Sequence, residues 1–183
     1  MSQTLEQRID RLESLDAIRQ LPAKYALTLD MRDIDAMVTL FAEDVRVGRD
    51  KSGRLALREY MDATLRSPFT GTSHHIGGHI IEFDDPDHAH GIVYSKNEHE
   101  TPVADGQDEW VIMQMMYVDD YVRQNGRWYF AFRKRVVDWT YEAPSAPAST
   151  AAGLTRGENG PGDVSYQSLP NLAAFLSNGR KSG

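Results

Sequence analysis

The spacing of apolar residues changes once along the 183-residue chain, near Gly71, and this change limits the folds open to it. Before Gly71, apolar residues recur every three or four positions, as in Leu5, Ile9, Leu12 and Leu15, which is the period of a helix. After Gly71 they alternate with polar residues, which is the period of a strand. Helices followed by long strands predict an α+β domain, with helices packed on one face of a curved antiparallel sheet.

The N-terminal part predicts further helical segments. Four apolar residues share one face of a second segment: Ile18, Leu21, Tyr25 and Leu29. Pro22 lies inside this pattern and marks either a kink or the first turn of a new helix. Asp33 is expected to open a short third helix, and a fourth is expected to run from Gly53 to about residue 65.

Turn residues divide the later part of the chain into strands. The predicted strands cover residues 74–83, 89–99, 109–121 and 127–141, and a short additional strand is expected at 45–47. The Asn125-Gly126 pair predicts a tight hairpin between the last two strands, because both residues accept the positive φ of such turns.

Residues 142–183 differ in composition from the rest of the chain. Ala, Pro, Ser and Gly make up 23 of these 42 residues, which is typical of irregular structure. Leu169, Leu172 and Phe175 are spaced for one short amphipathic turn near Asn171. We therefore expect a domain at 1–141 and an irregular extension at 142–183 that packs on this domain or on a neighbouring subunit.

The charge and composition exclude several classes of function. The net charge is −7, whereas binding to nucleic acid or to an anionic membrane needs a basic face. No apolar run approaches the ~18 residues of a membrane span, and no basic-then-apolar signal begins the chain. With no Cys, thiolate nucleophiles and thiolate metal sites are excluded. The sequence has no glycine-rich loop of the kind that binds nucleotides. Together these observations lead us to expect a soluble cytoplasmic protein.

The histidine-rich stretch 73–79 is the first candidate for chemistry. In a regular strand His75 and His79 face one side, and His74 faces the other. If the first set faces the interior, His75 points into the space between sheet and helices. Two histidines four residues apart on a strand are separated by ~13 Å, too far to share one metal ion, so no metal site is expected. An ordinary structural role is the alternative for all three histidines.

Asp30 is the second candidate. It ends the apolar helix face that contains Tyr25 and Leu29. Its carboxylate is either a cap for the segment that follows or a buried acid. A buried acid needs a partner such as histidine, arginine or tyrosine.

The segment 15–45, which includes Tyr25 and Asp30, resembles the N-terminal signature of SnoaL-like domains in the nuclear transport factor 2-like superfamily. The stretches 73–79 and 125–129 fall where that family has its sheet. The chain is most similar to the branch that contains scytalone dehydratase, bile-acid 7α-dehydratase and hexachlorocyclohexane dehydrochlorinase. The resemblance implies a conical α+β barrel, in which a curved, mixed or antiparallel sheet wraps around the N-terminal helices and encloses a deep apolar pocket.

The resemblance also implies roles for individual residues. Asp30 matches the aspartate that orients a histidine on the sheet, and His75 matches that histidine, which removes a proton from the substrate. Tyr25, His99 and an arginine of the last strand match residues of the substrate pocket. That arginine is Arg135, with Arg133 as the alternative. Independently of the resemblance, Trp110 and Tyr117 are expected to offer aromatic surface to a ligand.

We therefore expect a cofactor-independent lyase of the dehydratase or elimination type, acting on a hydrophobic, aromatic or polycyclic small molecule. The alternatives are an isomerase or a carbon–carbon lyase (one that releases formaldehyde, for example) with the same dyad, and a non-catalytic domain that binds small molecules. The related dehydratases are trimers, and the outward side chains of the last two strands are partly apolar. A homo-oligomer is expected, with a trimer favoured over a dimer.

Overall fold

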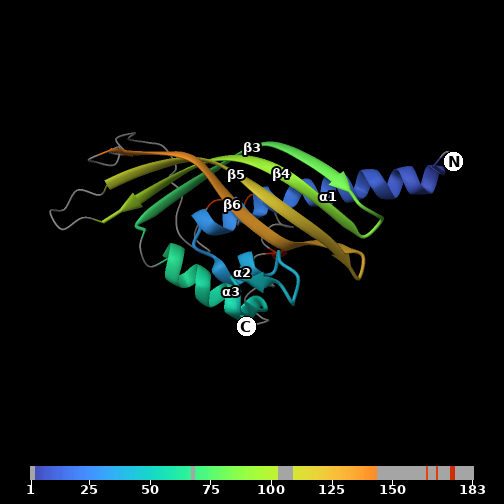
Figure 1. Ribbon diagram of the computed structural model, residues 1–183, viewed down its shortest axis with the longest axis horizontal. Coiled ribbons are helices and arrows are strands. Elements are labelled where there is room, and N and C mark those ends of the chain that lie inside the picture. Colours follow the sequence, from blue (N-terminus) through green and yellow to red (C-terminus); the bar gives the residue numbers. More distant parts are fainter. Residues whose placement is uncertain are drawn as a thin grey trace.

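The computed structural model describes residues 3–66, 69–102 and 109–143, and four positions of the C-terminal extension, 164, 168, 174 and 175. Helices formed by the first third of the chain pack against one face of a curved sheet (Figure 1). The predicted α+β fold with N-terminal helices and a curved antiparallel sheet is confirmed. In the described part of the chain, no helix has both the length and the apolar character needed to cross a membrane.

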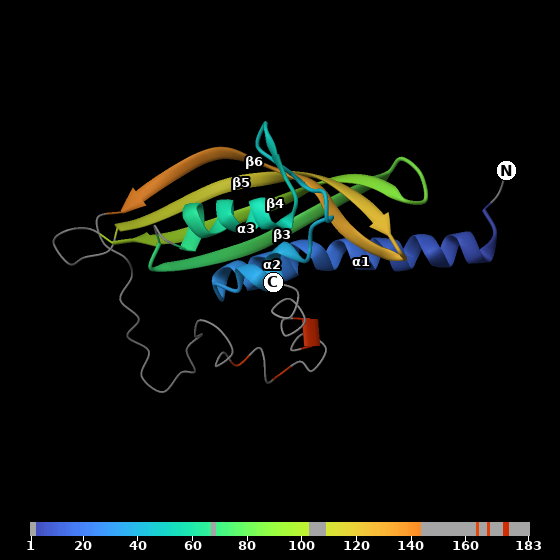
Figure 2. The ribbon, with the colours of Figure 1, turned by 90° about the horizontal axis from the view of Figure 1, so that it is seen from below.

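The first helix, α1 (Leu5–Asp30), is continuous where the sequence predicted two segments. It begins with a capping box, in which the side chains of Thr4 and Gln7 each accept the other's backbone N–H. Pro22 lies inside the helix, which continues past it to Asp30. The predicted apolar face is buried: Ile18, Leu21, Tyr25 and Leu29. The first turns extend beyond the sheet (Figure 2), so Leu5, Ile9 and Leu12 are exposed.

Two shorter helices and a small hairpin complete the helical layer. Helix α2 (Ile34–Val38) is capped by Asp33, whose carboxylate accepts the Ala36 N–H at 3.1 Å. Helix α3 (Arg54–Met61) continues into a π-helical turn, η1 (Asp62–Arg66). Strands β1 (Arg46–Val47) and β2 (Lys51–Ser52) pair between α2 and α3.

The sheet has four antiparallel strands in chain order: β3 (Gly71–Phe83), β4 (His88–Thr101), β5 (Glu109–Gln124) and β6 (Arg127–Ala143). All four predicted strands are confirmed, and each extends beyond its predicted range. Asn125 and Gly126 have φ of 51° and 76°, as the predicted tight turn requires. Because β3 and β6 are the two edges, the curved sheet is an open cone and does not close into a barrel.

A bulge in β3 reverses the direction of the side chains before it. The pairing with β4 shifts by one residue between Ile76 and His79, so that Gly77 and Gly78 together oppose Tyr94. One extra residue inverts the alternation of a strand. His79 therefore faces the helices as predicted, but upstream of the bulge it is His74, and not His75, that faces them.

The described part of the C-terminal extension contacts the helical layer through Phe175. This ring packs against the cluster of Met31 and Ala36, and it lies 5.7 Å from the Lys24 ammonium group. Leu169, Asn171 and Leu172 lie outside the described residues, and the division at residue 141 stays a prediction.

Close packing of β3 on β4 makes Gly91 sensitive to substitution. A Cβ at Gly91 would lie 2.6 Å from the Ile80 carbonyl oxygen, so backbone would have to move. Gly91→Ala should lower the free energy of unfolding by ~1–3 kcal/mol, the cost of overpacking. Gly78→Ala is the matched control, because no heavy atom lies within 4 Å of the corresponding Cβ. The free energy of unfolding of both variants is measured by urea denaturation. Equal values for Gly91→Ala and Gly78→Ala would contradict the close packing at Gly91.

Candidate active site

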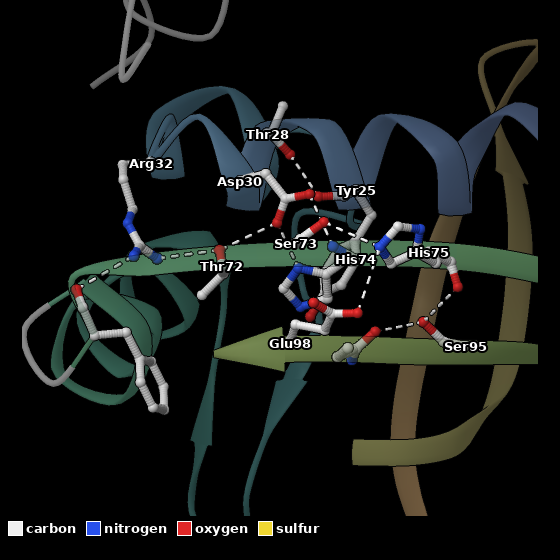
Figure 3. A network of polar contacts seen from close by, with 12 residues as sticks. Tyr25, Thr28, Asp30, Arg32, Thr72, Ser73, His74, His75, Ser95 and Glu98 are labelled. Carbon is white, nitrogen blue, oxygen red and sulfur yellow. Dashed lines mark hydrogen bonds and ion pairs between the residues drawn. The ribbon is translucent and has the colours of Figure 1, made fainter. Parts of the chain in front are cut away.

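Asp30, the last residue of α1, holds the ring of His74 on β3 (Figure 3). Its Oδ1 accepts hydrogen bonds from His74 Nδ1 at 2.6 Å and from the Thr72 hydroxyl at 3.1 Å. Its Oδ2 accepts the His74 backbone N–H at 2.9 Å. Because a carboxylate only accepts hydrogen bonds, Nδ1 carries the hydrogen, and the lone pair of neutral His74 lies on Nε2.

The sequence left open whether Asp30 caps the next helix or is an acid with a partner. Asp33 caps that helix, and Asp30 is hydrogen-bonded to His74. The predicted contact between Asp30 and His75 is wrong, because the bulge turns His75 outward. The His75 side chain is 61% exposed and has Ser73 and Glu98 as neighbours, whereas the His74 side chain is 4% exposed.

His74 lines a small cavity of about 90 Å³. Polar and apolar side chains share its walls, and the polar ones include Asn97, His99 and Tyr117. His74 Nε2 forms no hydrogen bond with any residue that the structure describes. The cavity therefore offers a proton acceptor whose orientation is fixed by a carboxylate and whose reactive atom is unengaged.

His99, predicted to bind substrate, lines the same cavity. The centre of its ring lies 4.5 Å from that of Phe69 and 5.6 Å from that of His74. Burial, assisted by the charges of His74 and Arg32, lowers the pKa of His99 to about 4. His99 is thus neutral at physiological pH and does not oppose the protonation of His74.

Tyr117 on β5 adds a hydroxyl group to the cavity. Asn97 Nδ2 donates to the Tyr117 oxygen at 2.8 Å, and Asn97 Oδ1 accepts the Ser95 hydroxyl. Tyr117 donates its own hydrogen to no described residue. Burial raises the pKa of Tyr117, so the hydroxyl keeps its proton at neutral pH and is available as a donor.

A larger pocket of about 670 Å³ adjoins the small cavity. The two share three wall residues: Tyr25, Met61 and Arg135. Tyr25 and Arg135 were predicted to bind substrate, and the structure places both at this junction. Trp110, also predicted, pairs with Ala143 on β6 and lines neither space.

The two candidate arginines of β6 occupy different environments. Arg133 is buried and donates from Nε and Nη2 to the Asp119 carboxylate at 2.8 and 2.6 Å. Burial opposes its charge, but Asp119 outweighs burial and raises the pKa of Arg133. The guanidinium also lies 4.1–4.4 Å from the ring centres of Tyr25, Tyr117 and Phe130. Arg135 is exposed and donates to the Tyr60 hydroxyl at 2.8 Å.

A series of hydrogen bonds links Asp119 to His79 through Tyr121. The Tyr121 hydroxyl donates to Asp119 Oδ2 at 2.8 Å and lies 3.0 Å from His79 Nε2. Burial lowers the pKa of His79 to about 4, against the attraction of Asp119. His79 thus supports the ion pair as a neutral residue.

Sequence reasoning missed His74, Asn97 and Asp119 as site residues. For Asp119 a signal was present, because it shares the inward phase of β5 with Tyr117 and Tyr121. An acid in the inward phase of an apolar strand requires a buried cation.

Among the described residues, no three His, Asp or Glu side chains come together as a set of metal ligands.

Comparison with known proteins identifies the family. The model of the SnoaL-like domain matches residues 10–134. The chain belongs to the SnoaL-like family. The resemblance stated from the sequence is thereby confirmed, while no curated protein matches the chain.

Two solved structures share the fold of this chain. A candidate scytalone dehydratase from Novosphingobium aromaticivorans is 23% identical, with 81% of this chain and 99% of its own covered, and has a TM-score of 0.64. The hexachlorocyclohexane dehydrochlorinase LinA-type3 from Novosphingobium barchaimii is 18% identical, with 79% and 99% covered, and has a TM-score of 0.68. At these identities the likeness establishes a common fold.

The two buried histidines predict a pH dependence of stability. The pKa of His79 and of His99 is about 4 in the folded protein, against an ordinary 6.5. Between these values the unfolded chain binds more protons than the folded one. Their contribution to the free energy of unfolding is therefore complete above pH 6.5 and is lost as the pH falls towards 4. In urea unfolding, His79→Gln should flatten this slope, and an unchanged slope would refute the assignment.

Proposed function

We propose that this chain is a lyase of the dehydratase or elimination type, acting on a hydrophobic, ring-containing small molecule. The observation that carries the proposal is the 2.6 Å contact between Asp30 and Nδ1 of His74, a residue that lines a cavity. Such a pair makes histidine a competent general base, because the carboxylate fixes the tautomer and stabilises the imidazolium that forms.

In this proposal His74 replaces His75 as the base. His74 Nε2 takes a proton from a carbon atom of the substrate. The electrons of that C–H bond form the new double bond, and the leaving group departs with the electrons of its own bond. The charge that remains on His74 is balanced by Asp30.

The leaving group needs a donor, and Tyr117 is suited to this role. Its hydroxyl accepts from Asn97, keeps its proton at neutral pH, and lines the same cavity as His74. A fixed donor in a dry cavity stabilises developing negative charge better than mobile water does. Since base and donor are both side chains, the reaction needs no cofactor.

The substrate class follows from the walls of the larger pocket. They include the apolar side chains of Phe41, Val45, Val47, Leu57 and Met61. A volume of about 670 Å³ lies within the range of pockets for drug-sized molecules. The structural relatives named for dehydratase and dehydrochlorinase activity support the elimination reaction. The same dyad would also serve an isomerase or a carbon–carbon lyase, which product analysis distinguishes.

The test compares two adjacent histidines. In a panel of hydroxylated aromatic and steroidal compounds, His74→Ala should lower kcat/KM by ~10²–10⁴, the range for a positioned general base. His75→Ala is the matched control and should retain activity, because its side chain is exposed. Asp30→Asn should cost a similar factor, and the double variant should cost little more because the pair acts as one unit.

Two results would overturn this mechanism. Loss of activity in His75→Ala with retention in His74→Ala would return the base role to His75. Binding of panel compounds without turnover of any of them would identify the chain as a binding domain. Circular dichroism of each variant confirms that the fold is retained.

We also predict a homo-oligomer, with a trimer favoured over a dimer. The outer face of the sheet exposes a set of large apolar side chains: Ile80, Ile92, Tyr94, Val118, Trp139 and Tyr141. Val118→Lys should shift the wild-type assembly to monomer in analytical ultracentrifugation. Leu12→Lys, on the projecting end of α1, is the control and should leave the assembly intact. A wild-type monomer at micromolar concentration would contradict the prediction.

A further inference from the structure

The walls of the larger pocket carry much more positive than negative charge. Five cationic residues line it: Arg46, Lys51, Arg133, Lys134 and Arg135. Glu59 is the single carboxylate among the described residues that line it. The chain as a whole carries a net charge of −7, so this concentration of positive charge is local to the pocket.

Most of this charge has no carboxylate partner. Asp119 neutralises Arg133, whereas among the described residues Arg135 has a hydrogen bond only to the neutral hydroxyl of Tyr60. Arg46 lies over the Phe132 ring at 5.0 Å. No described residue forms an ion pair with Arg46, Lys51, Lys134 or Arg135. Positive charges gathered along one cleft attract anions, because their fields add and raise the local concentration of an anionic ligand.

Arg135 places this charge next to the proposed reaction site. It is one of the residues shared by the larger pocket and the cavity of His74. Its hydrogen bond to Tyr60 joins β6 to α3, so the guanidinium has a defined position at the junction. Arginine in such a position binds a carboxylate or phosphate through charge-assisted hydrogen bonds.

We infer that the substrate is an amphipathic anion, with an apolar ring body and an oxyanion group, such as a carboxylate, that binds at Arg135 and Arg46. The inference rests on the proposed function, since it specifies the substrate class of the same site. The ring body occupies the apolar part of the pocket, and the anionic group sets the depth at which the reacting carbon meets His74.

Two probes of matched shape test this inference. 2-Naphthoate and 2-naphthamide share the ring body and differ in charge. By isothermal titration calorimetry at low ionic strength, 2-naphthoate should bind at least about tenfold more tightly, the equivalent of one hydrogen bond to a charged group. The difference should shrink as sodium chloride is added, because salt screens the exposed charges. Equal binding of the two probes, or binding of neither, would overturn the inference.

Charge-neutralising variants locate the effect. Arg135→Gln and Arg46→Gln should each weaken 2-naphthoate severalfold and leave 2-naphthamide nearly unchanged. Arg8→Gln, which removes the same charge from the exposed start of α1, is the control and should alter neither affinity. Unchanged 2-naphthoate affinity in both pocket variants would refute the assigned position, and thermal unfolding confirms that the variants are folded.

One further variant separates this inference from the proposed function. Asp30→Asn should lower kcat/KM by ~10²–10⁴ while 2-naphthoate still binds more tightly than 2-naphthamide. A chain that discriminates the probes but catalyses no elimination refutes the lyase and retains the anion site. A chain that catalyses elimination but binds both probes equally refutes the anion site alone.

Discussion

The buried ion pair between Arg133 and Asp119 helps to position α1 on the sheet, because the ring of Tyr25 on α1 packs against its guanidinium. Each of the two charges needs the other, since a charge without a partner is unstable in the protein interior. The two side chains are 4% and 0% exposed. Removing one partner of such a pair costs ~3–5 kcal/mol. The guanidinium also contacts the ring of Tyr25 on α1, so the pair fixes that helix as well as β5 and β6. Asp30 lies five residues after Tyr25, about 7.5 Å along the helix axis, and its position beside β3 follows from this anchor.

The end of α1 is an unfavourable place for a carboxylate, since a helix carries partial negative charge at its C-terminus. Hydrogen bonds from β3 offset this cost, through the Thr72 hydroxyl and through the ring and backbone of His74. Arg32 adopts a left-handed conformation, with φ of 58°, that costs ~1–2 kcal/mol. Its guanidinium donates to Thr72 and to the Phe69 carbonyl. The same hydrogen bonds therefore dock the end of α1 on β3 and orient the ring of His74.

The sequence predicted the elements of this fold well, because apolar periodicity and turn chemistry are local properties. The turn at Asn125-Gly126 and the buried face of α1 needed no knowledge of the rest of the chain. The orientation of His74 and His75 could not be predicted in this way, since it depends on where the extra residue of a bulge lies. The Gly77-Gly78 pair is a sequence signal for a bulge. The prediction instead assumed that side chains alternate strictly through these glycines, and it therefore placed His75 on the inner face of the sheet in place of His74. The polar partners of the site, such as Asn97, depend on pairing between distant strands and could not be found from spacing.

The three histidines His74, His79 and His99 lie in different electrostatic surroundings, and only His74 is our proposed base. His79 lies near Arg133, and His99 near Arg32 and Arg135, so positive neighbours reinforce the effect of burial on both. His74 alone of the three has a carboxylate in direct contact with its ring. Positive charge formed on His74 is therefore balanced locally, whereas a proton on His99 would meet the charges of Arg32 and Arg135 without a contacting anion. The two imidazole rings of the cavity, 5.6 Å apart, therefore differ in their partners: a carboxylate contacts His74, and cationic residues lie near His99.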